Sequence, residues 1–443
     1  LILPVSSLSA VLVDQQQTPK FDQDDDMATS IGEVTAPSGH RLEYAQQWGT
    51  STHDQFGIGQ LRMETPRSFH ATVVVNMPNQ HQVLVVIGGN DSRKSKVSSW
   101  LDTVWGGVMS LGARSLASVE CFDIYAAGVP SAAGIKLPNL TTPRAGHVAA
   151  SFGTKIYVFG GVDHNCNMLF TVEVLDLNHV DQGWQQLASA LRIPRFLAAV
   201  AVHGQCVYIS GGLDPGQEDP PKRVSRVSCD SLGLFSVEVF NMHTQAFLVD
   251  HVPDMLVPIN PQHERPFGFL WPTSACVHLQ MEGEARPASP HIVVGYGYSR
   301  RRLLVLDVRN PEKGWIHLPV KRRAAVSRHV QSVVQSVVVG GFLVIVGYNN
   351  EDCRLWTALD LQTLEWVLDW RTWDNQTKLA AVGRTLYHGQ QQIKVGHNLV
   401  FVGRNTLVSV GGHPAWPFLP FETLYISAGM PWHQEKEWGL CFT

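Results

Sequence analysis

Short apolar runs separated by turn residues fill most of the chain, and several of them end in a glycine pair. Four carry the complete pattern, HQVLVVIGG (81–89), GTKIYVFGG (153–161), GQCVYISGG (204–212) and RNTLVSVGG (404–412), and SPHIVVGYG (289–297) and GGFLVIVGY (340–348) are degraded copies. Their length and their content of Val and Ile predict buried β-strands. A second strand follows each run, as in TVEVLDLN (171–178) and SVEVFNMH (236–243).

Two further elements complete the repeat. A short segment after the second strand carries a tryptophan at Trp184, Trp315 and Trp366, and a strand before the glycine pair opens with Pro-Arg at Arg67, Arg144 and Arg195. Four strands thus recur six times, with a mean period of about 65 residues between Gly89 and Gly412. Sheets this small cannot bury their faces alone, so we expect them to stack around a common axis.

The order of these elements resembles the Kelch repeat. The segment 143–187 carries every part of it: Pro143, Arg144, His147, Gly160, Gly161, Glu173, Asp176 and Trp184. The resemblance extends over about residues 60–440, with looser copies in the C-terminal half. It implies an all-β fold, a six-bladed Kelch-type β-propeller with seven blades as an alternative, over residues 39–443. Residues 1–38 form an N-terminal extension, with an apolar start and an acidic linker.

Structural roles are expected for the repeated residues. Glycine lets neighbouring blades approach closely and allows positive φ. Tryptophan wedges between adjacent sheets, and arginine bridges blades by donating to backbone carbonyls. The residues concerned are Arg67, Gly88, Gly89, Arg144, Gly160, Gly161, Trp184, Arg195, Gly211, Gly212, Trp315, Trp366, Gly411 and Gly412.

Two segments compete for the outer strand of the last blade. PWHQE (431–435) would supply it from the C-terminal end, whereas RLEYAQQW (41–48) would supply it from the N-terminal end as a clasp. The sequence leaves both possibilities open.

Composition narrows the classes of partner. The 443 residues are 44% hydrophobic and 16% charged, with a net charge of −4. The chain therefore lacks the excess of positive charge that would indicate binding to a nucleic acid or to an anionic membrane surface. The apolar run 1–13 is too short to span a bilayer, and it is either a remnant of a targeting segment or a packed extension. Seven scattered cysteines without a CxxC motif favour a reducing intracellular compartment.

No pattern in the sequence indicates catalysis. The nineteen histidines form no HxH, HxxxH or HExxH motif, and no phosphate-binding glycine loop is present. We therefore assign no catalytic residue, no metal and no cofactor. Some Kelch-like propellers are oxidases, mutarotases or lyase-like enzymes, so an enzyme or small-ligand binder that uses the axial channel is the alternative function.

Two long insertions interrupt the repeat after a glycine pair, at 90–117 and at 213–235. The first combines Arg93 and Lys94 with Trp100, Trp105 and Met109, which either contact a partner or cap the propeller's own channel. The second carries Lys222, Arg223 and Arg226, suited to an acidic partner or simply solvated, and the last repeat adds Trp416 and Phe418. Aromatic, Met and Arg side chains are typical of interface cores. The sequence therefore predicts a non-catalytic scaffold, adaptor or assembly subunit that binds a protein partner through one loop-decorated face.

Overall fold

The structure is a computed structural model in which nearly every regular element is a β-strand. It describes residues 30–35, 41–47, 63–65, 67–77, 82–91, 115–124, 130–132, 137–165, 167–213, 234–255, 272–281, 288–295, 303–320, 332–339, 341–348, 354–366, 397–402, 406–411 and 421–429. Within these ranges, the helical elements are two short 3-10 helices, η4 (Val180–Gln182) and η6 (Pro311–Lys313).

Five sheets consist of four antiparallel strands each, and we number them as blades one to five. Blade one contains β4 (Ala71–Asn76), β5 (Gln82–Ile87), β7 (Val119–Ile124) and β8 (Pro130–Ala132). Blade two contains β9 (Val148–Phe152), β10 (Lys155–Phe159), β11 (Thr171–Asp176) and β12 (Gln185–Ala190). Blade three contains β13 (Ala199–His203), β14 (Cys206–Ser210), β15 (Val237–Asn241) and β16 (Ala246–Leu248). Blade four contains β17 (Thr273–Leu279), β18 (Ser289–Gly295), β19 (Leu303–Asp307) and β20 (Ile316–His317). Blade five contains β21 (Ser332–Val339), β22 (Phe342–Tyr348), β23 (Arg354–Asp360) and β24 (Glu365–Trp366).

A five-stranded sheet combines the two ends of the chain. Its strand order is β1 (Ser30–Thr35), β2 (Arg41–Gln47), β27 (Phe421–Gly429), β26 (Thr406–Gly411) and β25 (His397–Val402). The antiparallel register between β2 and β27 runs from Arg41 opposite Gly429 to Gln47 opposite Thr423. Of the two segments expected to compete beside the last strand, the N-terminal one therefore occupies the place, and residues 431–435 lie outside the described residues.

The prediction of six or seven equivalent four-stranded blades is wrong, because five sheets have that form. A periodic pattern relates strands that are close in sequence, whereas β2 pairs with β27 across almost the whole chain. The domain boundary expected at residue 39 falls between β1 and β2, which pair with each other. A further two-stranded sheet joins β3 (Arg67–Ser68) to β6 (Asn90–Asp91) beside blade one.

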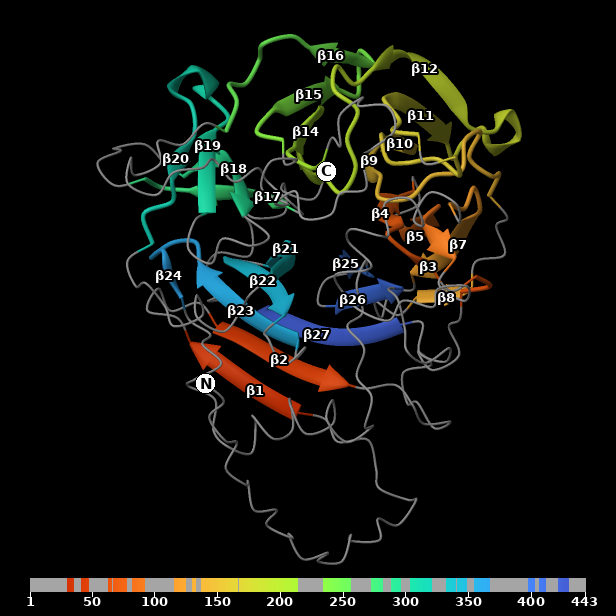
Figure 1. The fold of residues 1–443 in the computed structure, drawn as a ribbon. Coiled ribbons are helices and arrows are strands. Elements are labelled where there is room, and N and C mark those ends of the chain that lie inside the picture. Colours follow the sequence, from red (N-terminus) through yellow and green to blue (C-terminus); the bar gives the residue numbers. More distant parts are fainter. Residues whose placement is uncertain are drawn as a thin grey trace, which may run out of the picture.

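The sheets surround a central axis (Figure 1). Successive inner strands, β4, β9, β13, β17, β21 and β25, contact one another in that order, and β25 in turn contacts β4. The ring of small antiparallel sheets is the arrangement of a β-propeller. The hydrophobic clusters of the described side chains lie between neighbouring blades, so burial there depends on the adjacent sheet.

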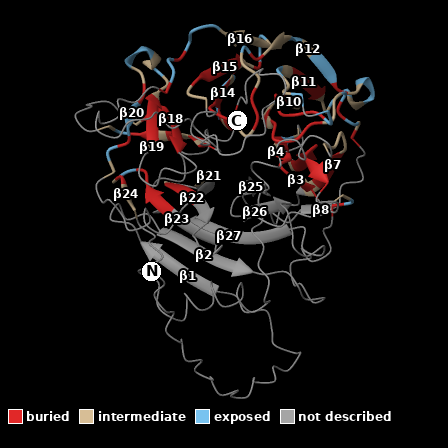
Figure 2. Ribbon diagram, viewed as in Figure 1, coloured by how far each residue is buried: buried red, intermediate tan, exposed pale blue. Residues whose placement is uncertain are grey.

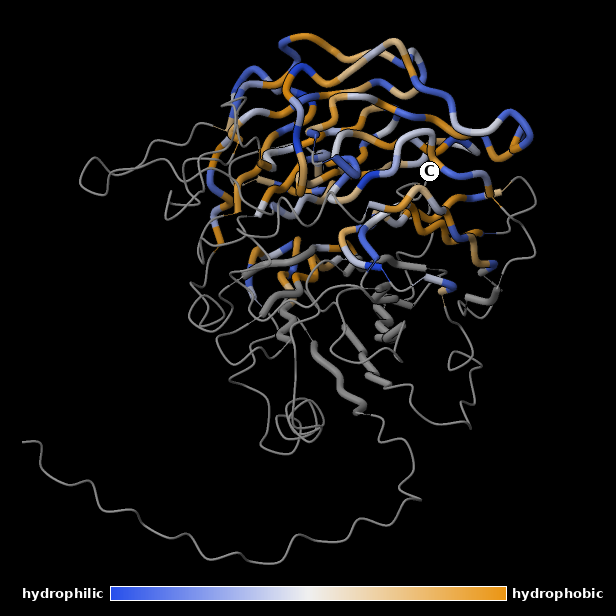
Figure 3. The backbone as a smooth tube through the Cα atoms, turned by 45° about the vertical axis from the view of Figure 1, so that its right-hand side comes forward, coloured by the Kyte–Doolittle hydropathy of each residue, from blue (hydrophilic) through white to orange (hydrophobic). Residues whose placement is uncertain are grey.

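Buried residues alternate between the two faces of each blade. In β14, Val207 and Ile209 belong to the cluster between blades two and three, whereas Tyr208 belongs to the cluster between blades three and four. Figure 2 shows β18 and β19 of blade four buried and the outer strand β12 of blade two largely exposed. The hydropathy of the chain follows the same plan, with apolar strands and hydrophilic turns (Figure 3).

Two tryptophans connect an outer edge to the neighbouring blade. Trp184, which is 5% exposed, donates from its indole nitrogen to the carbonyl of Pro138 at 3.0 Å, and Trp315 donates to the carbonyl of Pro253 at 2.9 Å. Each acceptor lies in the segment that leaves the preceding blade. The side chains add apolar area between sheets while their N–H groups keep a partner. Trp366 is half-buried and packs against the cluster between blades four and five.

Candidate binding face

The glycine pairs and the Pro-Arg segments of blades one to three lie at the same end of these blades, which we call the glycine end. The reason is topological. The middle strand that ends in the pair runs antiparallel to the inner strand that the arginine precedes. The segment after each glycine pair, where the long insertions occur, therefore starts at this end. What holds the glycine end in place decides whether it can support a binding surface.

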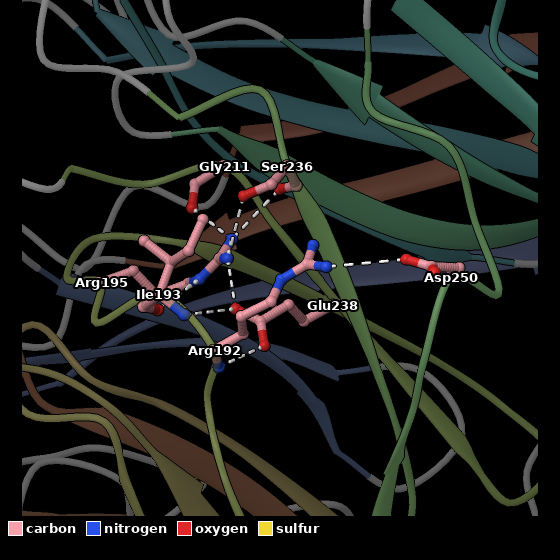
Figure 4. A network of polar contacts seen from close by, with 7 residues as sticks. All are labelled: Arg192, Ile193, Arg195, Gly211, Ser236, Glu238 and Asp250. Atoms are coloured by element: carbon pink, nitrogen blue, oxygen red, sulfur yellow. Dashed lines mark hydrogen bonds and ion pairs between the residues drawn. The ribbon is translucent and has the colours of Figure 1, made fainter.

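A buried arginine at the glycine end connects three strands of its own blade. In blade three, Arg195 donates through Nη1 to the carbonyls of Gly211 and Ser236, both at 3.1 Å. Its Nη2 donates to the Ser236 hydroxyl at 3.0 Å and to Oε1 of Glu238 at 2.6 Å (Figure 4). The segment before β13, the end of β14 and the start of β15 are thus bound to one side chain.

The glutamate partner also holds the chain that enters the blade. Glu238 accepts from the backbone N–H of Arg192 at 2.7 Å and of Ile193 at 3.2 Å (Figure 4). Each arginine–glutamate pair, with its backbone partners, is called an arginine latch below. Blades one and two repeat the latch with Arg67, Gly88, Ser118 and Glu120 and with Arg144, Gly160, Thr171 and Glu173.

The latches are desolvated ion pairs. The side chains of Arg67, Arg144 and Arg195 are at most 1% exposed. Burial lowers the pKa of each guanidinium, and the facing carboxylate raises it again. An arginine stays protonated under these conditions. Breaking such a pair leaves an uncompensated buried charge. Each latch therefore holds the segment that enters the blade in a fixed position relative to the strands of that blade.

The expected bridge between blades has a different origin. The guanidinium bonds of each arginine stay within its own blade, and it is the backbone of Arg144 and Arg195 that reaches the preceding blade: the N–H of Arg144 donates to the carbonyl of Leu116 at 3.2 Å, and both arginine carbonyls accept from a glycine. Gly89 donates to the carbonyl of Arg144 at 2.8 Å, and Gly161 donates to that of Arg195 at 2.9 Å. The sequence identified the arginine as the bridging residue, but it could not show that the backbone, and not the side chain, makes the bonds between blades.

A second set of backbone bonds runs from blade to blade. Gly146 donates to the carbonyl of Phe69, and Leu197 donates to the carbonyl of Gly146, both at 2.7 Å. All three residues stand two positions after a latch arginine and have positive φ, +52° for Phe69, +64° for Gly146 and +55° for Leu197. Bulky residues rarely adopt this left-handed conformation, so blades one and three retain a local strain that the bonds to their neighbours offset.

The glycine pairs permit this close packing. A Cβ on Gly88 would lie 2.7 Å from the carbonyl oxygen of Arg144, and one on Gly160 would lie 2.6 Å from that of Arg195. Gly211 and Gly212 also have positive φ. Gly411 ends β26, and Gly412 lies outside the described residues.

One hydrogen bond recurs where each connection returns to its blade. Leu116 donates to the carbonyl of Gly89 at 2.7 Å, Leu169 to that of Gly161 at 2.8 Å, and Leu234 to that of Gly212 at 2.8 Å. The connections closed by this bond range from the short one of blade two to the two long insertions. The frame of the glycine end is thus the same whatever the length of the loop that it carries.

Apolar side chains from blades one to three meet at the glycine end. The cluster contains Phe69, Ala145, Val162, Phe196 and Leu213, with Met168 and Leu197 packed against it. Leu213 is also the first residue of the insertion in blade three. Phe170, in the connection of blade two, is 52% exposed.

The residues predicted to bind a partner lie outside the described residues. They are Arg93, Lys94, Trp100, Trp105 and Met109 in the first insertion, Lys222, Arg223 and Arg226 in the second, and Trp416 and Phe418 in the last repeat. The described residues instead give the frame from which the two insertions start. The role of Glu120, Glu173 and Glu238 in that frame was not predicted from the sequence, although each of them follows a valine at the same place in the second strand of its repeat.

The described part of the chain offers no constellation for metal chemistry. No group of three or more His, Cys, Asp or Glu side chains in it is placed to hold a metal ion. Nor is any helix in the described ranges long and apolar enough to cross a membrane.

Comparison with known proteins points to one family motif. Residues 143–180 match the Kelch motif. The match covers most of blade two, the segment in which every element of the repeat is present. No curated protein sequence matches the chain.

Proposed function

Because this chain is a β-propeller built on the Kelch motif, we propose that it is a non-catalytic protein-binding scaffold that holds a partner on its glycine end. The recurring hydrogen bond from Leu116, Leu169 and Leu234 to the second glycine of each pair carries the proposal. It closes connections of very different length on the same frame. Binding proteins commonly place variable loops on a fixed scaffold in this way.

The frame is stiff enough to present such loops. Arginine latches fix the chain entering blades one to three, and carbonyl bonds connect these blades to one another. A loop whose ends are fixed loses less conformational entropy on binding than one whose ends move. The two insertions thus start from preorganised positions, and their Trp, Met and Arg side chains suit an interface core.

The basic residues of the second insertion indicate that the partner carries an acidic surface. Lys222, Arg223 and Arg226 lie within five residues of one another and would meet an acidic surface. We further propose that the five-stranded sheet closes the ring between blades five and one. A closed ring would keep the glycine ends of all blades on one face, as a subunit of a larger assembly requires.

Alanine substitutions in the loops test the binding role. The partner is isolated with the full chain from its native source, produced separately, and titrated against the wild type and the triple variant W100A/W105A/W416A. We expect at least a tenfold loss of affinity with an unchanged melting temperature, because aromatic anchors dominate interface energies.

A matched control removes exposed apolar groups elsewhere. Val249, 82% exposed, and Ile316, 49% exposed, lie beside and within the outer strands of blades three and four. The variant V249A/I316A should bind as the wild type does. Equal affinity of the folded triple variant and the wild type would refute the proposal.

A further inference from the structure

Two thiols and an imidazole gather where blade three meets blade four. His203 is the last residue of β13 and Cys206 the first residue of β14, and the two are directly opposite in the hairpin register. Cys276 lies on β17 of blade four, and its Sγ is 3.7 Å from Nδ1 of His203. The hairpin is at the end of blade three opposite its glycine end, so this group is separate from the proposed binding face.

Both sulfur atoms belong to the same interface. Cys206 and Cys276 pack against the cluster between blades three and four, together with Tyr208. Directly opposite residues of an antiparallel pair have Cβ atoms about 4.5–5.5 Å apart and point to the same face, so His203 shares the face of Cys206. Cys206 and Cys276 are thiols rather than parts of a disulfide.

Tyr208 lies at the same interface as the two thiols, in the cluster against which both of them pack. Burial raises the pKa of its phenol, and the charges of Cys206 and Cys276 raise it further.

The imidazole is positioned to accept a thiol proton. Burial lowers the pKa of His203, and the charge of Arg309 lowers it further, so the ring is neutral near pH 7 and its basicity is reduced. In the tautomer that carries its proton on Nε2, Nδ1 is an acceptor 3.7 Å from the sulfur and is positioned as a general base, and the thiolate is the nucleophilic form of cysteine. Cys206 and Cys276 are both half-buried, so a small reagent can reach them.

We propose that Cys276 is a hydroperoxide-reactive thiol, with His203 as its base and Cys206 as the resolving thiol that forms a disulfide between blades three and four. In the first step His203 takes the thiol proton and the sulfur attacks one peroxide oxygen. The S–O bond forms as the O–O bond breaks. The sulfur is oxidised by two electrons, and the departing hydroxide or alkoxide takes the proton from the imidazolium.

In the second step the Cys206 sulfur attacks the sulfenic acid of Cys276. The S–S bond forms as the S–O bond breaks, and water leaves with the Cys206 proton. Overall, two thiols and one hydroperoxide give one disulfide, one alcohol or water, and one further water. The product joins blades three and four covalently.

Cys121 provides an internal comparison. It is buried in blade one, and burial, followed by the charge of Asp123, raises its pKa to about 12. A thiol of this kind contributes little thiolate at neutral pH. Burial also raises the pKa of Cys206, so the difference lies in access: Cys121 is buried, whereas Cys206 and Cys276 are half-buried. We therefore expect Cys121 to stay reduced when Cys276 reacts.

Peroxide treatment of the full chain tests the proposal. The protein is exposed to stoichiometric hydrogen peroxide, alkylated, and digested without reduction for mass spectrometry. We expect a peptide pair joined through Cys206 and Cys276, lighter by two hydrogens than the separate peptides. In C206S the same treatment should leave a sulfenic acid on Cys276 that a 1,3-dione reagent captures.

The role of His203 is tested by rate. His203→Gln should slow the oxidation of Cys276 at least tenfold at pH 7 and should shift the pH profile of the rate upward, because the base is lost. Circular dichroism verifies that the variant is folded, and C121S should react as the wild type does. An unmodified Cys276, a disulfide that involves another cysteine, or an unchanged rate in His203→Gln would overturn the proposal.

Discussion

Arg195 and Glu238 meet through Nη2 and Oε1 atoms 2.6 Å apart, with side chains 1% and 7% exposed. Arg192 and Asp250 form a second pair only a few residues away, at 3.6 Å, with side chains 61% and 84% exposed (Figure 4). The first pair orders the glycine end of blade three, whereas the second is screened by water. The contrast between them leads to the first prediction.

Replacing Glu238 with Gln should destabilise the fold by roughly 3–5 kcal/mol, because the guanidinium of Arg195 is left as an uncompensated buried charge. Urea denaturation measures the loss. Asp250→Asn, which breaks the exposed pair, should leave the unfolding midpoint unchanged. Equal effects of the two substitutions would show that the arginine latch contributes no more than a surface pair.

Gly160→Ala should destabilise the protein more than Gly153→Ala. Both positions have positive φ, so both variants lose about 1–2 kcal/mol from the backbone conformation. A Cβ at Gly160 would also lie 2.6 Å from the carbonyl oxygen of Arg195, whereas one at Gly153 meets nothing within 4 Å. We expect an additional loss of about 1–3 kcal/mol at Gly160 from this clash. Thermal denaturation of the two variants side by side checks the difference.

Acid should weaken the fold through His147. Burial lowers the pKa of this side chain to about 3, and the charges of Arg144 and Arg67 contribute to the shift. An unfolded histidine has a pKa near 6.5, so between these two values the unfolded state binds one more proton than the folded state. The contribution is complete above pH 6.5 and is lost as the pH falls toward 3, at about 1.4 kcal/mol per pH unit.

His147→Ala removes this proton uptake. Its stability at pH 7 falls because a buried ring is lost, but its stability should decrease less steeply between pH 6 and pH 4 than that of the wild type. The same substitution at His179, which is 59% exposed, is the control for the loss of a histidine side chain. Denaturation curves measured at several pH values decide the point, and parallel slopes for His147→Ala and the wild type would contradict it.

The pairing of β2 with β27 can be tested by an engineered disulfide between the two strands. Ala45 on β2 is opposite Tyr425 on β27, so cysteines at these two positions have Cβ atoms close enough to be bridged. The variant A45C/Y425C should form a disulfide under oxidising conditions and should raise the melting temperature. In A45C/S427C the cysteines are diagonal, because Ser427 is opposite Glu43, and the disulfide should not form. Bridging in the second variant alone would show a different register.

The amino-acid sequence by itself determined the local repeat. Short runs rich in Val and Ile predicted the strands. The glycine pairs after β5, β10 and β14 predicted where the middle strands end. These features depend on residues that are near one another in the chain, so a periodic pattern reveals them. The positions of the two long insertions followed in the same way, as interruptions of a period.

Only the tertiary structure decided how the parts are joined. The pairing of β2 with β27 connects residues about 380 positions apart, and no periodic signal relates them. The local sequence around Glu238 does not reveal the role of its side chain. That role follows from the fold, which places Arg195 and the backbone N–H of Arg192 next to its carboxylate. The contact of Cys276 with His203 likewise exists only because two blades pack together. Local patterns specify the blades, whereas contacts between distant segments specify the ring and its polar chemistry.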